Sequence, residues 1–139
     1  MRYAVKLIDD DNDTILVTVP DLPEAITFGD DRDDALARAS DAIETAIMGM
    51  IAAREVIPSP KSKGRDYVAL PALTCAKIEL YNAMRKSKVG KAALAKRLGV
   101  ALPQIDRLLD LRHQSRLDAL ERALDALGRS LTIVVKSAA

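Results

Sequence analysis

Alternating apolar and polar residues near the start of the chain predict a β-hairpin. Every second residue of the stretch 2–8 is apolar, and residues 14–19 alternate in the same way. The polar run 9–13 between them supplies the turn. We also expect a short third strand at residues 26–28, where an extended stretch ends at a glycine.

From residue 31 the apolar residues recur every three or four positions, which is the period of an amphipathic helix. The predicted helix covers residues 31–54, and aspartates at its start suit the exposed amides and the positive end of the helix dipole. Residues 58–66 have the composition of a linker, and residues 67–70 are typical of one more strand. A first domain at residues 1–57, completed by this returning strand, is therefore predicted to have the order β-β-β-α-β.

The second half of the chain, residues 72–139, contains helical patterns separated by glycine or proline. A glycine at position 128 ends the last of these patterns. Residues 131–135 are apolar and β-branched, so we expect a short strand that pairs with the first domain or with a second chain. The predicted fold class is α+β, with helices at 73–86, 91–98, 103–109 and 117–127.

Residues 92–109 have the spacing of a DNA-binding helix-turn-helix, whose second helix lies in the major groove. Gly99 stands where the turn is needed. Gln104 and Arg107 face outward near the start of the second helix, and such side chains bond to adenine and guanine. The alternative is a helical bundle that matches this spacing by chance. Residues on either side are predicted to contact DNA phosphates: Lys88, Lys91, Arg112, Ser115 and Arg116.

Charge is divided unevenly along the chain, although the formal net charge of the 139 residues is only +1. Residues 1–54 carry a net charge of −7 and residues 72–139 a net charge of +7. Net charge bears on a protein's partners more than on its fold. The two halves are therefore predicted to bind partners of different charge.

Composition excludes several classes of protein. No stretch approaches the roughly 18 apolar residues of a membrane-spanning helix, and the start of the chain lacks an apolar signal core, so we expect a cytoplasmic protein with no membrane partner. One cysteine and one histidine cannot supply an internal disulfide or a conventional zinc site. The sequence indicates no cofactor, no metal and no catalytic residue.

Three segments together resemble the HicB antitoxins of bacterial toxin–antitoxin systems. They are the start MRYAV, the run VPDLPEAITFGD at residues 19–30 followed by an alanine-rich helix, and the appended helix-turn-helix. The resemblance implies an N-terminal domain of partial RNase H-like fold that binds and blocks HicA, a small RNA-cleaving toxin of double-stranded-RNA-binding-domain fold. It also implies a C-terminal domain of the phage-repressor type that dimerises, binds the operator of its own operon and represses it.

The resemblance and the charge together suggest how each partner is bound. A toxin that cleaves RNA should be basic, and an acidic domain would be drawn to its RNA-binding surface. We expect toxin contacts at Asp21, Glu24 and Thr27. One helix-turn-helix reads few bases, so we expect a homodimer on double-stranded operator DNA, with higher oligomers left open. The predicted dimer contacts lie in the last strand: Leu131, Ile133 and Val135.

Two other functions stay open at this point. The chain could be a stand-alone transcriptional regulator whose N-terminal domain senses a small ligand, although no glycine-rich phosphate loop or aromatic cluster supports this. It could also be a metal-dependent nuclease that uses the aspartates of residues 9–13. Acidic residues are common in solvated turns, however, and alternation points these side chains apart. We therefore predict that the protein is not an enzyme.

Overall fold

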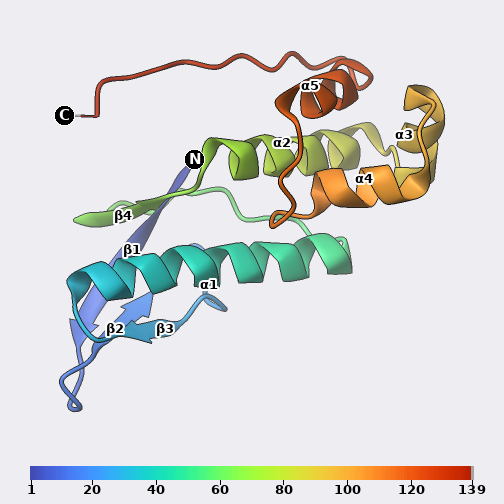
Figure 1. Ribbon diagram of the computed structural model, residues 1–139. Coiled ribbons are helices and arrows are strands. Elements are labelled where there is room, and N and C mark those ends of the chain that lie inside the picture. The colour runs from blue at the N-terminus through green and yellow to red at the C-terminus, as the bar shows by residue number, and fades with distance from the viewer. Residues whose placement is uncertain (139) are drawn as a thin grey trace. The chain divides into compact units, whose positions relative to one another are not determined.

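The computed structural model describes residues 1–138, which form two compact units, Met1–Ala72 and a second that begins at Leu73 (Figure 1). The first unit holds a four-stranded antiparallel sheet in the order β3-β2-β1-β4. Each element lies within one residue of its predicted bounds, and the order β-β-β-α-β is confirmed: β1 Arg2–Asp9, β2 Ile15–Thr18, β3 Thr27–Gly29, α1 Arg32–Ala53 and β4 Asp66–Ala69.

The core of this unit lies between α1 and one face of the sheet. Tyr3 and Val17 on the strands are fully buried, as are Ile43 and Ile47 on the helix. Gly29 lets the start of the helix come close, because a Cβ atom there would lie 2.4 Å from the Cα atom of Ala35. The glycine that ends the third strand is thus required by packing.

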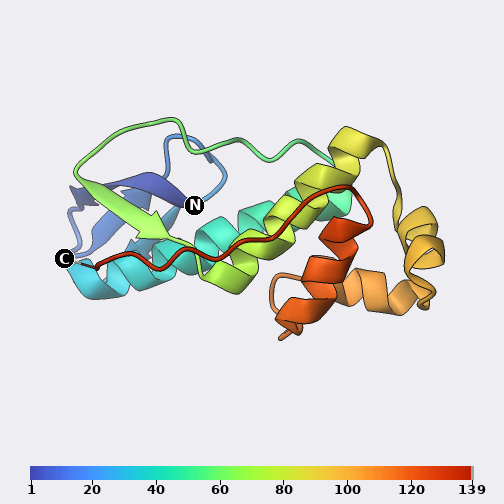
Figure 2. The same ribbon diagram turned by 90° about the horizontal axis from the view of Figure 1, so that it is seen from above.

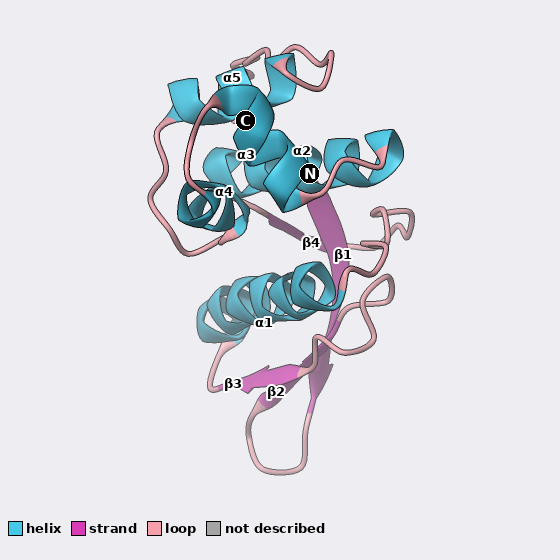
Figure 3. Cartoon of the chain, turned by 90° about the vertical axis from the view of Figure 1, so that its right-hand side faces the viewer, coloured by secondary structure: helices cyan, strands magenta, loops and turns pink. Residues whose placement is uncertain are grey.

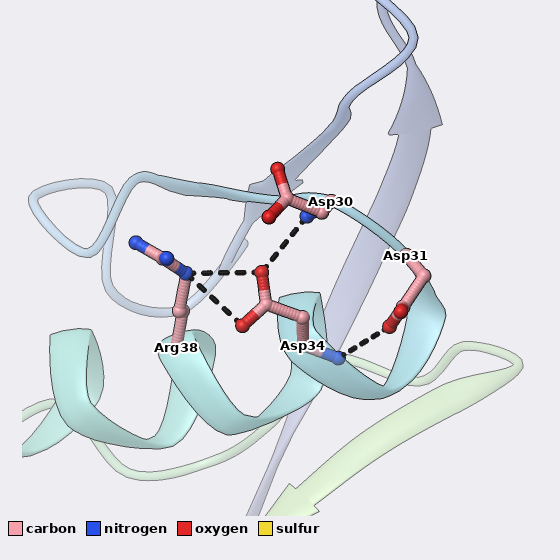
Figure 4. A network of polar contacts seen from close by, with 4 residues as sticks. All are labelled: Asp30, Asp31, Asp34 and Arg38. Atoms are coloured by element: carbon pink, nitrogen blue, oxygen red, sulfur yellow. Dashed lines mark hydrogen bonds and ion pairs between the residues drawn. The ribbon is translucent and has the colours of Figure 1, made fainter.

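The aspartates before α1 organise the start of that helix (Figure 4). The side chain of Asp31 caps the helix by accepting a hydrogen bond from the Asp34 amide at 2.8 Å. The carboxylate of Asp34 accepts one from the Asp30 amide at 2.8 Å and pairs with Arg38 one turn later. These contacts hold the pKa of Asp34 below its ordinary value, with the Asp30 amide as the main cause. The aspartates at residues 30–34 therefore stabilise the start of α1, as expected from the sequence.

The second unit is helical, with α2 Ala72–Ser87, α3 Lys91–Leu98, α4 Leu102–Leu109 and α5 Leu117–Asp125. The last helix ends two residues before its predicted bound, because a turn closes there. The amide of Arg129 donates to the carbonyl of Leu124, and Gly128 takes the left-handed conformation, with φ of +73°. The end of this helix is therefore a glycine-closed turn.

The strand predicted at residues 131–135 does not form in the single chain. These residues lie in an extended trace after α5 that belongs to no sheet (Figure 2). Ile133, Val134 and Val135 expose 62%, 71% and 92% of their surface. A strand needs a hydrogen-bonding neighbour, and among the described residues the sheet contains only β1 to β4.

Candidate functional site

Helices α3 and α4 form the helix-turn-helix that the spacing predicted. Leu94 and Ala95 on the first helix are buried, as are Ile105 and Leu108 on the second. Gly99 ends α3 in the left-handed conformation, with φ of +66°, and its amide donates to carbonyls of the last turn. The glycine thus permits the change of direction between the helices.

Gln104 and Arg107 lie on the exposed side of α4. They are three residues apart, so they share one face of the helix, whereas Ile105 and Leu108 point to the core. Within residues 1–138, neither of the two side chains takes part in a hydrogen bond or ion pair with the protein. Both are therefore open to an outside partner.

The end of α4 is held by a lysine that the sequence analysis missed. Lys77 on α2 is fully buried, and its Nζ atom donates to the Arg107 carbonyl and to Ser115 Oγ, each at 2.7 Å. Burial lowers the pKa of Lys77, while the charge of Asp110 acts in the opposite direction. The signal was a charged residue within an apolar helical pattern, since Lys77 lies among Ala76, Ile78 and Leu80.

The predicted phosphate-binding residues have different surroundings. Lys91 forms an ion pair of 2.8 Å with Asp106, which ties the start of α3 to α4. The Oγ atom of Ser115 accepts from Lys77 and lies 3.3 Å from the Arg107 carbonyl, so it is already engaged within the protein. Lys88 is exposed in the turn after α2 and Arg112 is exposed after α4, and Arg116 pairs with Asp118.

A hollow of about 310 Å³ lies beside the exposed face of α4. It brings together Gln104, Arg107, Ser115 and Arg116, which the sequence analysis placed at DNA contacts. Arg122 on α5 also lines it, one further cation that the sequence pattern did not indicate. Gly90 precedes α3 without a side-chain cap, so no hydroxyl is available at that helix start.

In the first unit, the half-buried Asp21 is hydrogen-bonded within the protein. Its carboxylate accepts hydrogen bonds from the amides of Lys61 and Ser62, both at 2.9 Å, and from Ser62 Oγ at 2.8 Å. These bonds, above all those from Ser62, hold the pKa of Asp21 below its ordinary value. Tyr3 adds a hydrogen bond to the Pro58 carbonyl at 2.7 Å. The segment predicted to be a linker is thus fastened to the sheet unit.

The other predicted contact residues are more accessible. Glu24 is exposed in the loop before β3, and Thr27 on β3 is half-buried. In the extended trace after α5, Leu131 is half-buried while Ile133 and Val135 are exposed. The predicted toxin contacts and the predicted dimer contacts therefore belong to different units.

Comparison with known proteins gives the family. A family model described as a HicB-like antitoxin of bacterial toxin–antitoxin systems matches residues 2–79. The chain belongs to the HicB family. Antitoxin HicB 2 of Photorhabdus laumondii is 41% identical over 134 residues, which is 96% of each protein. Antitoxin HicB of Pseudomonas fluorescens is 39% identical over 99% of the chain, and that of Escherichia coli K12 is 34% identical over 97%.

Membership of the HicB family confirms the predicted resemblance and bears on the alternatives. The relatives are named antitoxins, which regulate other proteins and are not enzymes, so the prediction of a non-enzyme is confirmed. In residues 1–138, no group of three or more acids, histidines or cysteines is placed to hold a metal ion. No helix in this part of the chain is long and apolar enough to cross a membrane.

The hydrogen bonds of Asp21 predict a pH-dependent contribution to stability. The folded pKa is lowered, so the contribution is present above the unfolded pKa of about 4 and is lost as pH falls through the folded value. Asp21→Asn should lower the melting temperature at pH 7, and this difference from wild type should shrink as the pH falls below about 4. Glu24→Gln is the control, because it removes the same charge from an exposed position. If the melting temperatures of Asp21→Asn and wild type differ by the same amount down to pH 2, the ionised Asp21 carboxylate does not stabilise the fold.

The bridge made by Lys77 predicts a loss of stability when its ammonium group is removed. Lys77→Met keeps most of the apolar stem but leaves the Arg107 carbonyl and Ser115 Oγ without their buried donor. We expect the free energy of unfolding, measured with urea, to fall by about 1–3 kcal/mol. Lys96→Met, on the exposed side of α3, should change it by less than about 0.5 kcal/mol. A Lys77→Met protein as stable as wild type would show that the bridge makes no net contribution.

Proposed function

We propose that this protein neutralises a small RNA-cleaving toxin with its first unit and represses its own operon by binding operator DNA with its second. The observation that carries this proposal is the full-length similarity to HicB antitoxins in a chain whose two halves have opposite charge. Both proposed partners are found in the bacterial cytoplasm, where we expect the protein to act.

The proposed toxin contact is electrostatic and steric. An enzyme that cleaves RNA must bind a polyphosphate, so its active site is lined with cations. Residues 1–54 carry a net charge of −7, and a surface of that sign is attracted to such an active site. Inhibition then needs only occlusion of the active site, with no chemistry by the antitoxin. Asp21, Glu24 and Thr27 stay proposed contacts, and the hydrogen bonds of Asp21 also fasten the loop that carries Glu24.

The proposed DNA contact uses the exposed face of α4. Gln104 and Arg107 project from the first two turns of this helix, where a recognition helix meets base edges. Bidentate bonds to adenine and guanine are the ordinary use of these side chains. Lys88, Arg112 and Arg116 lie outside this face and would contact phosphates, together with Lys91 once its pair with Asp106 rearranges.

The proposed dimer uses the extended residues after α5. Ile133, Val134 and Val135 are β-branched and exposed, and two copies of this segment paired across a two-fold axis would supply each other's missing strand neighbour. A two-fold dimer would place its recognition helices on half-sites about 34 Å apart, or a multiple of that distance. The contact residues proposed for this pairing are Leu131, Ile133 and Val135.

Arg107→Ala is expected to separate the two activities. It should weaken operator binding by about 1–3 kcal/mol and relax the preference for one base pair, because a base contact is lost. Lys88→Ala should instead weaken binding to all sequences and lower the salt dependence by about one counterion. The affinity for DNA and its dependence on salt concentration are measured by fluorescence anisotropy with operator and scrambled DNA.

The same variants test the toxin function in an RNA-cleavage assay. The assay uses the small basic protein that the proposal expects to be encoded beside this chain's gene, and both variants should inhibit it as well as wild type does. Equal loss of operator binding and inhibition would argue against separate sites. Failure of the wild-type protein to inhibit would overturn the antitoxin proposal.

A further inference from the structure

The first unit has an apolar row on the sheet face that α1 does not cover. In the register of the sheet, Ile8 on β1 lies opposite Leu16 on β2, and Leu16 lies opposite Phe28 on β3. Directly opposed residues of antiparallel strands project from the same face of a sheet. The three side chains therefore form one continuous row across three strands.

Packing of α1 identifies the face to which this row belongs. Gly29 is paired with Ile15, and the backbone of Ala35 on α1 sits against Gly29. Side chains alternate along a strand, so Leu16 and Phe28 point away from that helix. Figure 3 shows α1 on one side of β2 and β3. The row thus lies on the opposite side of the sheet.

These side chains are accessible to solvent. Ile8 and Phe28 each expose 47% of their surface and Ile26, two residues before Phe28, exposes 58%, while Leu16 is half-buried. We call these four residues the open apolar face. Single exposed apolar residues are ordinary, but contiguous ones rimmed by polar groups mark binding surfaces.

The rim of the open apolar face is mostly acidic. Asp10, Asp11 and Asp13 lie in the turn between β1 and β2, and Asp30 directly follows β3; all four are exposed. Lys6 lies on the same face of the sheet, paired with Thr18 in the next row. A surface of this kind fits a partner with apolar side chains surrounded by lysine and arginine.

We propose that the open apolar face is the docking surface for the basic toxin. This inference rests on the proposed function and specifies which face of the first unit performs it. The acidic rim argues against a second copy of the chain as occupant, because a two-fold contact would bring the two sets of aspartates together. Docking here would bury Ile8, Ile26 and Phe28 and set the aspartates against the cations of the toxin.

The experiment measures toxin affinity for a double variant, Ile8→Thr with Phe28→Thr, by calorimetry. Threonine is polar yet favours strands, so the sheet should be kept, as checked by circular dichroism and thermal melting. The control is Val56→Thr, which makes a similar change at a residue 68% exposed. Val56 lies just beyond the C-terminal end of α1, whereas Gly29 packs against the N-terminal end of that helix. The helix has 22 residues and is therefore about 33 Å long.

The double variant should bind the toxin at least about tenfold more weakly than wild type, with operator binding unchanged, because interface-centre residues each contribute more than about 1 kcal/mol. The Val56→Thr control should bind within about twofold of wild type. If the double variant unfolds, Ile26→Thr makes the same test outside the strands.

Three results would overturn the inference in different ways. Unchanged toxin affinity of the folded double variant would reject this face and leave the antitoxin function standing. A changed sedimentation coefficient of the free protein with unchanged toxin affinity would assign the face to self-association. Absence of toxin binding by the wild-type protein would reject the proposed function itself.

Discussion

The buried ammonium group of Lys77 is the contact on which the helical unit depends. A charge removed from water must be hydrogen-bonded, and here the two acceptors lie on separate segments, the last turn of α4 and the loop before α5. One side chain of α2 therefore fixes the end of the proposed recognition helix. The rotation of α4 about its own axis follows from this contact and from the buried Ile105 and Leu108. Gln104 and Arg107 are exposed as a consequence.

In the first unit, a hydrogen-bonded carboxylate plays the part that the Lys77 ammonium group plays in the second. The carboxylate of Asp21 receives two amides and a hydroxyl from residues 61 and 62, about forty positions along the chain. This closes the segment between α1 and β4 onto the loop before β3. The net charge of +1 is the sum of an acidic first half and a basic second half, which we propose attract a cationic protein and DNA respectively.

The sequence alone predicted the elements well because their patterns are local. Alternation located β1 and β2, the helical period located α1, and the glycine at position 99 located the turn between α3 and α4. What it missed depends on distant partners. The roles of Lys77 and Asp21 come from residues 30 to 41 positions away. The open apolar face is a further example, because only the pairing order β3-β2-β1-β4 and the packing of α1 on Gly29 show that Leu16 and Phe28 point away from α1. The strand predicted at residues 131–135 does not form, because no described strand is hydrogen-bonded to these residues.

The central claim is that the two units act on different partners, and separated fragments test it most directly. Fragments 1–72 and 73–138, each checked for folding by circular dichroism, are added to the proposed toxin in an RNA-cleavage assay. The account predicts that the folded first fragment inhibits cleavage and that the second does not. Inhibition by the second fragment alone, or by neither folded fragment when the full chain inhibits, would contradict it.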